Sequence, residues 1–432
     1  MAFGFFKKSI SADLVLTDAK VITLNADTPE ASAVACKDNK IIAVGEFDDI
    51  EHLINDDTQV IDLEGKYLVP GFISFFDKPV MKSFEGKYAD LSACNSTSDL
   101  SETLNAWIST HPDAEIYFGY GFHERTFGEG FEDNLEETTK FLDDCCNDRP
   151  LVLLAKNNLT CLLNSAGIEF VTQTAEEEMV EYITTPYILN LLIPFDFEEL
   201  ADTIERQIDE SISYGITSVL NLDSPEYFET FYQDVLVGLY NEDSLKQRFF
   251  GSYYMNRPVI TKGLIHHLMN RKNTCIELDD FVNANILYID LDSANCPLDF
   301  TQEMLDSIAE AVCDKGFDIF VKAASSSDLE MAYYSLEHIR SKGYKNIFAL
   351  QSDAVLDDDF VNELMYFDSA YVLSTDMSFE QISEMADIIG METKLGSIET
   401  GRLADMAVFA QNPFETPQKI KADMIIIDGK IV

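Results

Sequence analysis

The chain has 432 residues, of which 46% are hydrophobic, and it carries 30 Lys and Arg against 77 Asp and Glu. This composition supports a large apolar core and excludes an intrinsically disordered chain. The formal net charge of −47 repels the phosphates of nucleic acids and the headgroups of anionic lipids, so neither is expected as a partner.

Cysteine usage and hydropathy point to the cytoplasm. The eight cysteines are scattered without a C-x-x-C pair, which argues against a zinc knuckle and against a disulfide framework. The first nine residues lack the apolar core of a signal peptide, and no later run approaches the ~18 apolar residues of a membrane span. We therefore expect a cytoplasmic protein without a membrane segment.

Strands dominate both ends of the chain. Near the start, Ala31–Cys36 and Lys40–Gly45 flank a turn-prone Asp38, which predicts a β-hairpin. The last forty residues are similar, with apolar runs at Met406–Ala410 and Asp423–Val432. Two β-rich ends around a different middle predict one small β domain assembled from both termini.

Short buried strands alternate with amphipathic helices in the middle of the chain. Helical stretches such as Gln302–Lys315 and Asp328–Lys342 each end near a glycine. Such alternation predicts an α/β fold with a parallel sheet covered by helices on both faces. The predicted strands are Leu151–Ala155, Thr217–Asn221, Asn285–Ile289, Asp318–Val321, Asn346–Leu350 and Ala370–Leu373.

Five segments resemble the amidohydrolase superfamily. Tyr67–Ile73 is similar to its first barrel strand, and Gly396–Asp405 resembles its return into the β domain. Between them, Gly119–Phe122, Asn164–Ala166 and Gly215–Val219 match landmarks of the amidohydrolase-3 branch in the same order. The resemblance spans almost the whole chain, and its two end motifs are the specific ones.

The resemblance implies a distorted (β/α)8 barrel of residues 70–389, carrying a β-sandwich made of residues 1–69 and 390–432. It also implies hydrolysis of non-peptide C–N bonds by metal-bound water, because a bound metal lowers the pKa of water from about 15.7 to about 7. The family's ligands are two His on strand 1, a Lys or Glu on strand 4, a His on each of strands 5 and 6, and an Asp on strand 8. These ligands converge at the carboxyl end of the barrel.

This chain departs from that ligand set on its first strands. The paired histidines of strand 1 fall on Phe76 and Lys78, and the histidine before the Asn-Ser-Ala motif falls on Leu159. The strand-4 lysine falls near Ile286.

The later strands depart as well. The strand-5 histidine falls on Lys322, and the strand-6 histidine falls within residues 349–351, none of which is histidine. Only Asp376 matches its counterpart, the strand-8 aspartate, at a point where a long family segment is missing. The chain is therefore predicted to bind no catalytic metal and no other cofactor. The six histidines, none at a strand end in the required order, are His52, His111, His123, His266, His267 and His338.

Two lysines are predicted at the barrel end, with Asp376 facing them. An ammonium of Lys78 or Lys322 walled by Phe76 and Leu159 cannot stay charged and unpaired. Two interpretations remain open. Either a lysine pairs with Asp376 and plugs the site, or the two ammoniums take over the metal's charge and hold a small carboxylate.

For the other candidate residues, the sequence allows both a structural and a functional interpretation. His123 is a candidate general acid or base, or a surface histidine. Asp290 and Asp292 follow a buried strand and are either cation ligands or caps of the next helix. The serine run Ser325–Ser327 is a helix cap or the nucleophile of a pair with Lys322.

The leading hypothesis is an amidohydrolase-like protein without ordinary hydrolase activity. It would bind a small carboxylate or assist an active paralogue. The alternative is an active hydrolase of non-peptide C–N bonds, with a site rebuilt around Lys78, Lys322, Asp376 and His123. A third hypothesis is a structural subunit. The expected partners are a small anionic ligand and further copies of the chain.

Overall fold

The structure is a computed structural model, and it describes most of the chain in fifteen segments. No helix among the described residues is long and apolar enough to cross a membrane. Phe76, Lys78, Leu159 and Asp376 lie outside the described residues. The described residues are 11–75, 82, 84–128, 135–156, 160–174, 185–193, 196–222, 226–255, 257–278, 280–292, 299–352, 356, 358–373, 382–415 and 420–432.

A parallel sheet of seven strands forms the centre of the molecule. Its order is β18-β17-β16-β15-β14-β13-β8, and every neighbouring pair is parallel. The edge strands β8 and β18 each pair with one neighbour, so the sheet is open over the described residues. Its strands are β8 (Phe72–Phe75), β13 (Ile216–Asn221), β14 (Arg248–Met255), β15 (Val282–Asp290), β16 (Asp318–Ala323), β17 (Phe348–Ser352) and β18 (Ala370–Leu373).

Helices connect these strands, as the alternating pattern predicted. Several begin at a polar cap, because a side-chain oxygen there accepts a hydrogen bond from a free backbone N–H of the first turn. Thr261, Thr301 and Ser325 cap α9, α10 and α11 in this way. The helices are α7 (Phe197–Ile212), α8 (Glu226–Asn241), α9 (Lys262–Cys275), α10 (Gln302–Cys313), α11 (Ser326–Ser341) and α12 (Asp358–Met365), with α13 (Ile382–Ile388) following β18.

Successive side chains of the central strands face opposite sides of the sheet. Tyr288 and Phe320 belong to a hydrophobic cluster on the inner face. Their chain neighbours Ile289 and Val321 belong to a second cluster, with side chains of α10 and α11. Helices α10 and α11 thus cover the face of Ile289 and Val321, and we call the opposite face, that of Tyr288 and Phe320, the inner face.

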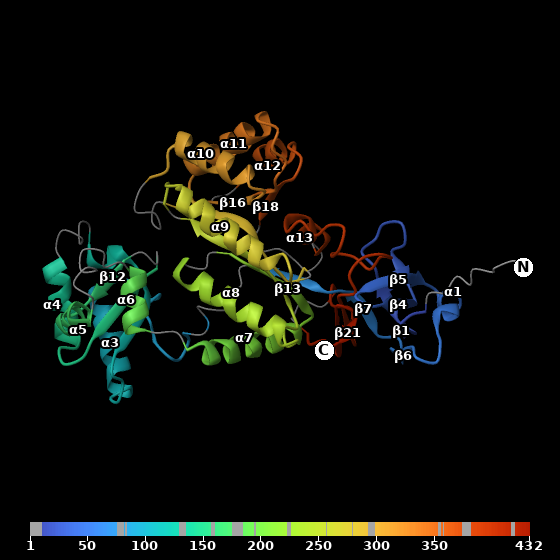
Figure 1. The fold of residues 1–432 in the computed structure, drawn as a ribbon, viewed down its shortest axis with the longest axis horizontal. Helices are drawn as coiled ribbons and strands as arrows, with labels where there is room; N and C mark the ends of the chain where they lie inside the picture. The colour runs from blue at the N-terminus through green and yellow to red at the C-terminus, as the bar shows by residue number, and fades with distance from the viewer. Residues whose placement is uncertain are drawn as a thin grey trace, which may run out of the picture.

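A separate lobe is inserted between β8 and β13, and Figure 1 shows it at one end of the long axis. Its sheet has the order β12-β11-β10-β9. Leu151–Ala155, expected in the central sheet, instead lies here as β11, because its ladder partners are β10 and β12. The lobe contains β9 (Ala89–Asp90), β10 (Tyr117–Phe122), β11 (Leu151–Ala155), β12 (Cys161–Leu163), α3 (Thr97–Thr110), η2 (Glu124–Phe127), α4 (Leu135–Cys145), α5 (Ser165–Thr174) and α6 (Thr185–Leu192).

Two further sheets lie at the opposite end (Figure 1). One has the order β5-β4-β1-β6, and the other β21-β20-β19-β7-β2-β3. The predicted hairpin is confirmed, since β4 and β5 pair antiparallel around Asp38. These elements are β1 (Leu14–Thr17), β2 (Lys20–Ile22), β3 (Glu30–Ala31), β4 (Ala33–Lys37), β5 (Lys40–Gly45), β6 (Gln59–Asp62), β7 (Tyr67–Pro70), β19 (Met406–Phe409), β20 (Met424–Ile427), β21 (Lys430–Ile431), α1 (Phe47–Ile50) and η1 (Glu51–Leu53).

Strands from the two ends of the chain share one sheet. β7 pairs with β19 antiparallel, with Pro70 opposite Met406. Buried side chains of both end sheets belong to one hydrophobic cluster, which includes Leu16 and Val408. The division into a β-sandwich of residues 1–69 and 390–432 and a barrel of residues 70–389 stays a prediction.

Candidate functional site

Polar side chains end three neighbouring strands of the central sheet in one row. Asp290 of β15 lies opposite Lys322 of β16, and Lys322 lies opposite Gln351 of β17. All three stand two residues after inner-face positions of the same strands, so they share the inner face. Ligands of α/β proteins bind outside the carboxyl ends of parallel strands, which makes this row the candidate site.

Lys322 is held between two carboxylates. Its Nζ lies 3.8 Å from Oδ2 of Asp290 and 3.8 Å from Oδ2 of Asp292. The Lys322 side chain is 18% exposed and that of Asp290 is 3% exposed, so water screens this ion pair weakly. One ammonium thus faces two negative charges.

Further hydrogen bonds fix Asp290. The Tyr254 hydroxyl donates to its Oδ2 at 2.9 Å, and the backbone N–H of Asp292 donates to its Oδ1 at 2.9 Å. These donors stabilise the ionised carboxylate in a buried position. From the sequence, Asp290 and Asp292 were candidate cation ligands or helix caps. In the structure they are counter-ions of Lys322.

Gln351 is fixed by a tyrosine on the same face. The buried Tyr288 hydroxyl donates to Oε1 of Gln351 at 2.6 Å, and the Tyr288 ring lies 6.0 Å from that of Tyr254. The sequence alone did not mark Tyr254 or Tyr288 as site residues. Both side chains face the same side of the sheet as Asp290 and Gln351. This alternation along the strands was the signal that could have identified them.

His123 approaches this site from the inserted lobe. It follows β10 at the start of η2. Burial lowers the pKa of His123, and the positive charges of Arg125 and Lys156 lower it further, against opposing effects of Glu124 and Asp292. Asp292, which follows β15, is thus among the groups that act on this pKa. A neutral imidazole at neutral pH follows from the lowered pKa.

The structure describes only some of the other predicted residues. Lys322 lies at a strand end on the inner face, as predicted. Its predicted pairing with Asp376 stays a prediction because Asp376 lies outside the described residues, as do Phe76, Lys78 and Leu159. Ser325 caps α11 with Asp328 in a reciprocal capping box, so its hydroxyl has the structural role.

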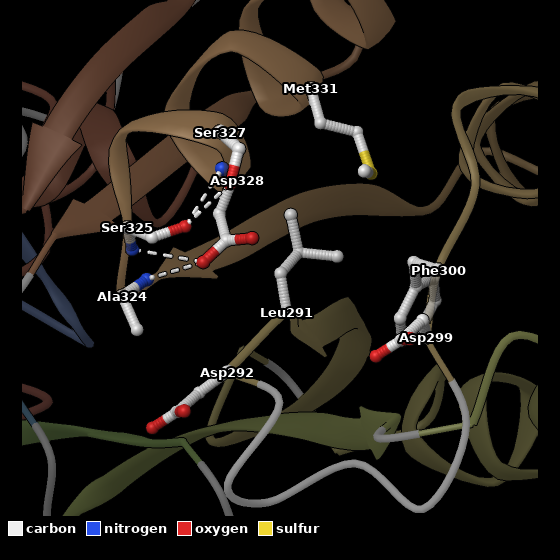
Figure 2. A pocket seen from close by; sticks show the side chains of 9 residues that line it. All are labelled: Leu291, Asp292, Asp299, Phe300, Ala324, Ser325, Ser327, Asp328 and Met331. Atoms are coloured by element: carbon white, nitrogen blue, oxygen red, sulfur yellow. Dashed lines mark hydrogen bonds between the residues drawn. The ribbon is translucent and has the colours of Figure 1, made fainter.

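A cavity of about 300 Å³ lies beside this row. Figure 2 shows the carboxylate of Asp328 bonded to the backbone N–H groups of Ala324 and Ser325, which closes the amino end of α11 to anions. Asp292 lines this cavity and also pairs with Lys322. The lining is Leu291, Asp292, Asp299, Phe300, Ala324, Ser325, Ser327, Asp328 and Met331.

The donor set of the row does not fit a catalytic transition metal. Zinc takes thiolate, imidazole or carboxylate ligands, whereas an ammonium donates protons and repels a cation. Lys322 Nζ lies between the carboxylates of Asp290 and Asp292. Within the described part of the chain, no three His, Cys, Asp or Glu side chains are grouped to hold a metal ion. No chemical step through a metal is therefore derived for this site.

Part of the chain is similar to a known protein family. Residues 59–240 match the model of the amidohydrolase family. The exoenzymes regulatory protein AepA of Pectobacterium carotovorum subsp. carotovorum is 27% identical over 172 residues, which are 39% of this chain and 36% of that protein. Protein LONG AFTER FAR-RED 3 of Arabidopsis thaliana is 20% identical over 354 residues, 76% of this chain and 59% of that protein. The chain thus matches less than two thirds of either relative.

A solved structure shares the fold. An uncharacterized metal-dependent hydrolase from Pyrococcus horikoshii OT3 superposes with a TM-score of 0.62 at 14% identity, covering 93% of this chain and 98% of that one. This likeness confirms the mixed α/β fold with a curled parallel sheet. Residues 59–240 therefore resemble the amidohydrolase family, and the whole chain shares its fold with a metal-dependent hydrolase.

Proposed function

We propose that this protein is a non-hydrolytic amidohydrolase, in which an ion network replaces the metal. The single observation behind the proposal is the position of Lys322, with Nζ 3.8 Å from a carboxylate oxygen of both Asp290 and Asp292. In the family, metal ligands converge at these strand ends to activate water. As an ammonium, Lys322 cannot coordinate a metal ion, and its positive charge opposes the binding of a cation by the two carboxylates.

The network acts as a plug of the barrel end. The two carboxylates beside Lys322 Nζ weaken the attraction of this ammonium for an anion. This favours the plug over the small-carboxylate site that the two lysines also suggested. A carboxylate ligand would have to replace Asp292, the more exposed of the two acids.

The proposed architecture is the family's barrel with its composite sandwich. The family fold, the parallel sheet and the ladder between β7 and β19 support it. The eighth strand of a closed barrel is not among the described strands, and only residues 374–381 separate β18 from α13. The missing family segment noted in the sequence is consistent with a reduced barrel end.

Metal binding to stripped protein tests the proposal. After removal of metal with a chelator, the protein is dialysed against zinc and analysed for bound metal beside the Lys322→His variant. We expect wild-type protein to retain well below one zinc per chain, whereas roughly one tightly bound equivalent at the barrel end would overturn the proposal. If acetate or succinate stabilises the wild type against heat but does not stabilise Lys322→Met, the carboxylate site is the correct interpretation and the plug is not.

A second candidate is a hydrolase with a rebuilt site, and His123 favours it. A neutral imidazole within electrostatic range of Asp292 could act as a general base. Hydrolysis of simple N-substituted amides by stripped protein, lost in His123→Ala and present in wild type, would establish this candidate. Equal background rates in the two proteins would eliminate it.

A further inference from the structure

Two exposed tyrosines mark the outer surface of the helices that cover the central sheet. Tyr366 is 87% exposed and Tyr334 is 54% exposed, and Met365 beside Tyr366 is 52% exposed. Tyr334 lies on α11, and Met365 ends α12, both at one outer side of the molecule in Figure 1. Large side chains this exposed and this close in space are unusual for a surface without a partner.

The two tyrosines belong to one continuous row of rings. The Tyr334 ring contacts that of Tyr333 with centroids 5.9 Å apart, and Tyr333 contacts Phe367 at 6.0 Å. Phe367 in turn contacts Tyr366 at 6.3 Å. We call these four rings the aromatic strip. Because Tyr333 and Phe367 hold its centre, the exposed rings at both ends are positioned before any partner binds.

Negative charges border the aromatic strip. Glu337 lies one helical turn after Tyr333 on α11, and Glu363 lies on α12 three residues before Tyr366. Burial, followed by the charges of Glu363 and Glu337, raises the pKa of Tyr333. Residues 326–337 and 356–369 carry the strip and contain no Lys or Arg, whereas Arg340 in the last turn of α11 donates to the carbonyl of Ser369. The strip is therefore an aromatic surface with an acidic border.

We propose that the aromatic strip docks a basic peptide segment of another protein. Arginine or lysine side chains bind over tyrosine faces and are attracted by carboxylates at the border, and an apolar side chain packs on Met365. A second copy of this chain fits poorly, since it would bring the same acidic border and a further net charge of −47.

Peptide binding by the intact protein tests this proposal. The probe is a labelled peptide of arginine alternating with leucine, and its affinity is measured by fluorescence anisotropy at physiological salt. We expect Tyr334→Ser combined with Tyr366→Ser to weaken binding about 5-fold to 30-fold, as two exposed cation–π contacts would. The substitutions leave the net charge unchanged, so general attraction to an acidic protein is the same in both proteins.

Matched variants separate the strip from other surfaces. Phe197→Ser removes an aromatic ring that is 47% exposed on α7, which lies on the opposite side in Figure 1, and should leave affinity unchanged. Tyr366→Phe should bind like wild type because it keeps the ring. Equal affinity of the double variant and wild type, or an equal loss in Phe197→Ser, overturns the proposal. Self-association of the wild type that is abolished by Tyr366→Ser overturns it too, because the occupant would then be a second copy.

Discussion

The ammonium of Lys322 is stabilised in its largely buried position by the charged and polar groups around it. Burial of an ammonium is unfavourable unless hydrogen bonds and opposite charges replace its water. Asp290 and Asp292 supply the charges, and Tyr254 fixes the orientation of Asp290. Removal of Lys322 alone is therefore unfavourable, because it leaves the buried carboxylate of Asp290 without this ammonium.

Replacing Lys322 alone should therefore destabilise the protein. In Lys322→Met, Asp290 keeps its hydrogen bonds but loses its counter-ion in a position that is 3% exposed. We expect the free energy of unfolding to fall by about 2 to 4 kcal/mol, measured by urea denaturation. Combining it with Asp290→Asn should recover most of this loss. A single variant as stable as wild type would show that Lys322 is not the counter-ion of Asp290.

Asp318 makes stability depend on pH at the other end of β16. Burial raises the pKa of Asp318 to about 6, although the backbone N–H of Ile347, which donates to Oδ1 at 2.9 Å, opposes the rise. Because the folded pKa exceeds the unfolded value, the folded state binds the proton more tightly. This group's contribution to stability is full below the unfolded pKa and is lost as pH rises through about 6.

The comparison of wild type with Asp318→Asn isolates this effect. Relative to the variant, wild type should gain about 1 to 3 kcal/mol of unfolding free energy between pH 7 and pH 4.5. Urea titrations of both proteins across this range measure the difference. A stability difference that stays constant with pH would mean that the carboxyl titrates normally in the folded protein.

Single residues also position whole elements, and Asn164 does so in the inserted lobe. It is fully buried immediately before α5. Its Oδ1 accepts hydrogen bonds from the N–H groups of Leu151 and Gly167, at 2.9 and 2.8 Å. Its Nδ2 donates to the carbonyls of Cys146 and Arg149, at 2.7 and 2.8 Å. One side chain thus joins the end of α4, the start of β11 and the first turn of α5.

Loss of this side chain should loosen the lobe. Asn164→Ala leaves two buried N–H groups and two carbonyls without their partner, and we expect a loss of about 2 to 4 kcal/mol. Hydrogen exchange should rise at the amides of Leu151 and Gly167, and urea denaturation measures the total. Ser165→Ala is the matched control, since its bond to Asp143 is exposed. An equal effect of the two variants would contradict the role of Asn164.

Across the whole molecule, one buried arginine joins the central sheet to the end sheets. Arg248 begins β14, and its Nε and Nη2 donate to the two carboxylate oxygens of Asp405, at 2.7 and 3.0 Å. Nη2 also donates to Asp428 at 3.0 Å, and the guanidinium lies 4.5 Å from the centre of the Phe281 ring. The acids raise the pKa of Arg248 against the opposing effect of burial. The family-like segment that ends at Asp405 therefore anchors the β-rich end to the sheet.

Arg248→Met should be the most destabilising of these substitutions. It leaves Asp405 buried and unpaired, so we expect a loss of about 3 to 5 kcal/mol, with the end sheets more sensitive to proteolysis. Arg248→Lys keeps the charge without the bidentate geometry and should lose less. Combining Arg248→Met with Asp405→Asn should recover part of the loss. A loss in Arg248→Met below about 1 kcal/mol would show that the ion pair does not hold the two parts together.

The sequence by itself determined the local elements and the resemblance to the family. The hairpin at Asp38 and the helices α10 and α11 are confirmed close to their predicted bounds, because turn residues, caps and apolar periodicity are local signals. The family motifs also located Lys322 at a strand end. These conclusions needed no knowledge of which segments meet.

Only the tertiary structure decided which segments pair. Leu151–Ala155 has the apolar composition of a central strand, yet its ladders to β10 and β12 place it in the inserted lobe. Likewise, Asp290 and Asp292 proved to be partners of Lys322, and Tyr254 joined them from another strand. Strand pairing and ion pairing join residues that are distant in the chain, and apolar periodicity carries no information about the partner of a strand or of a charge.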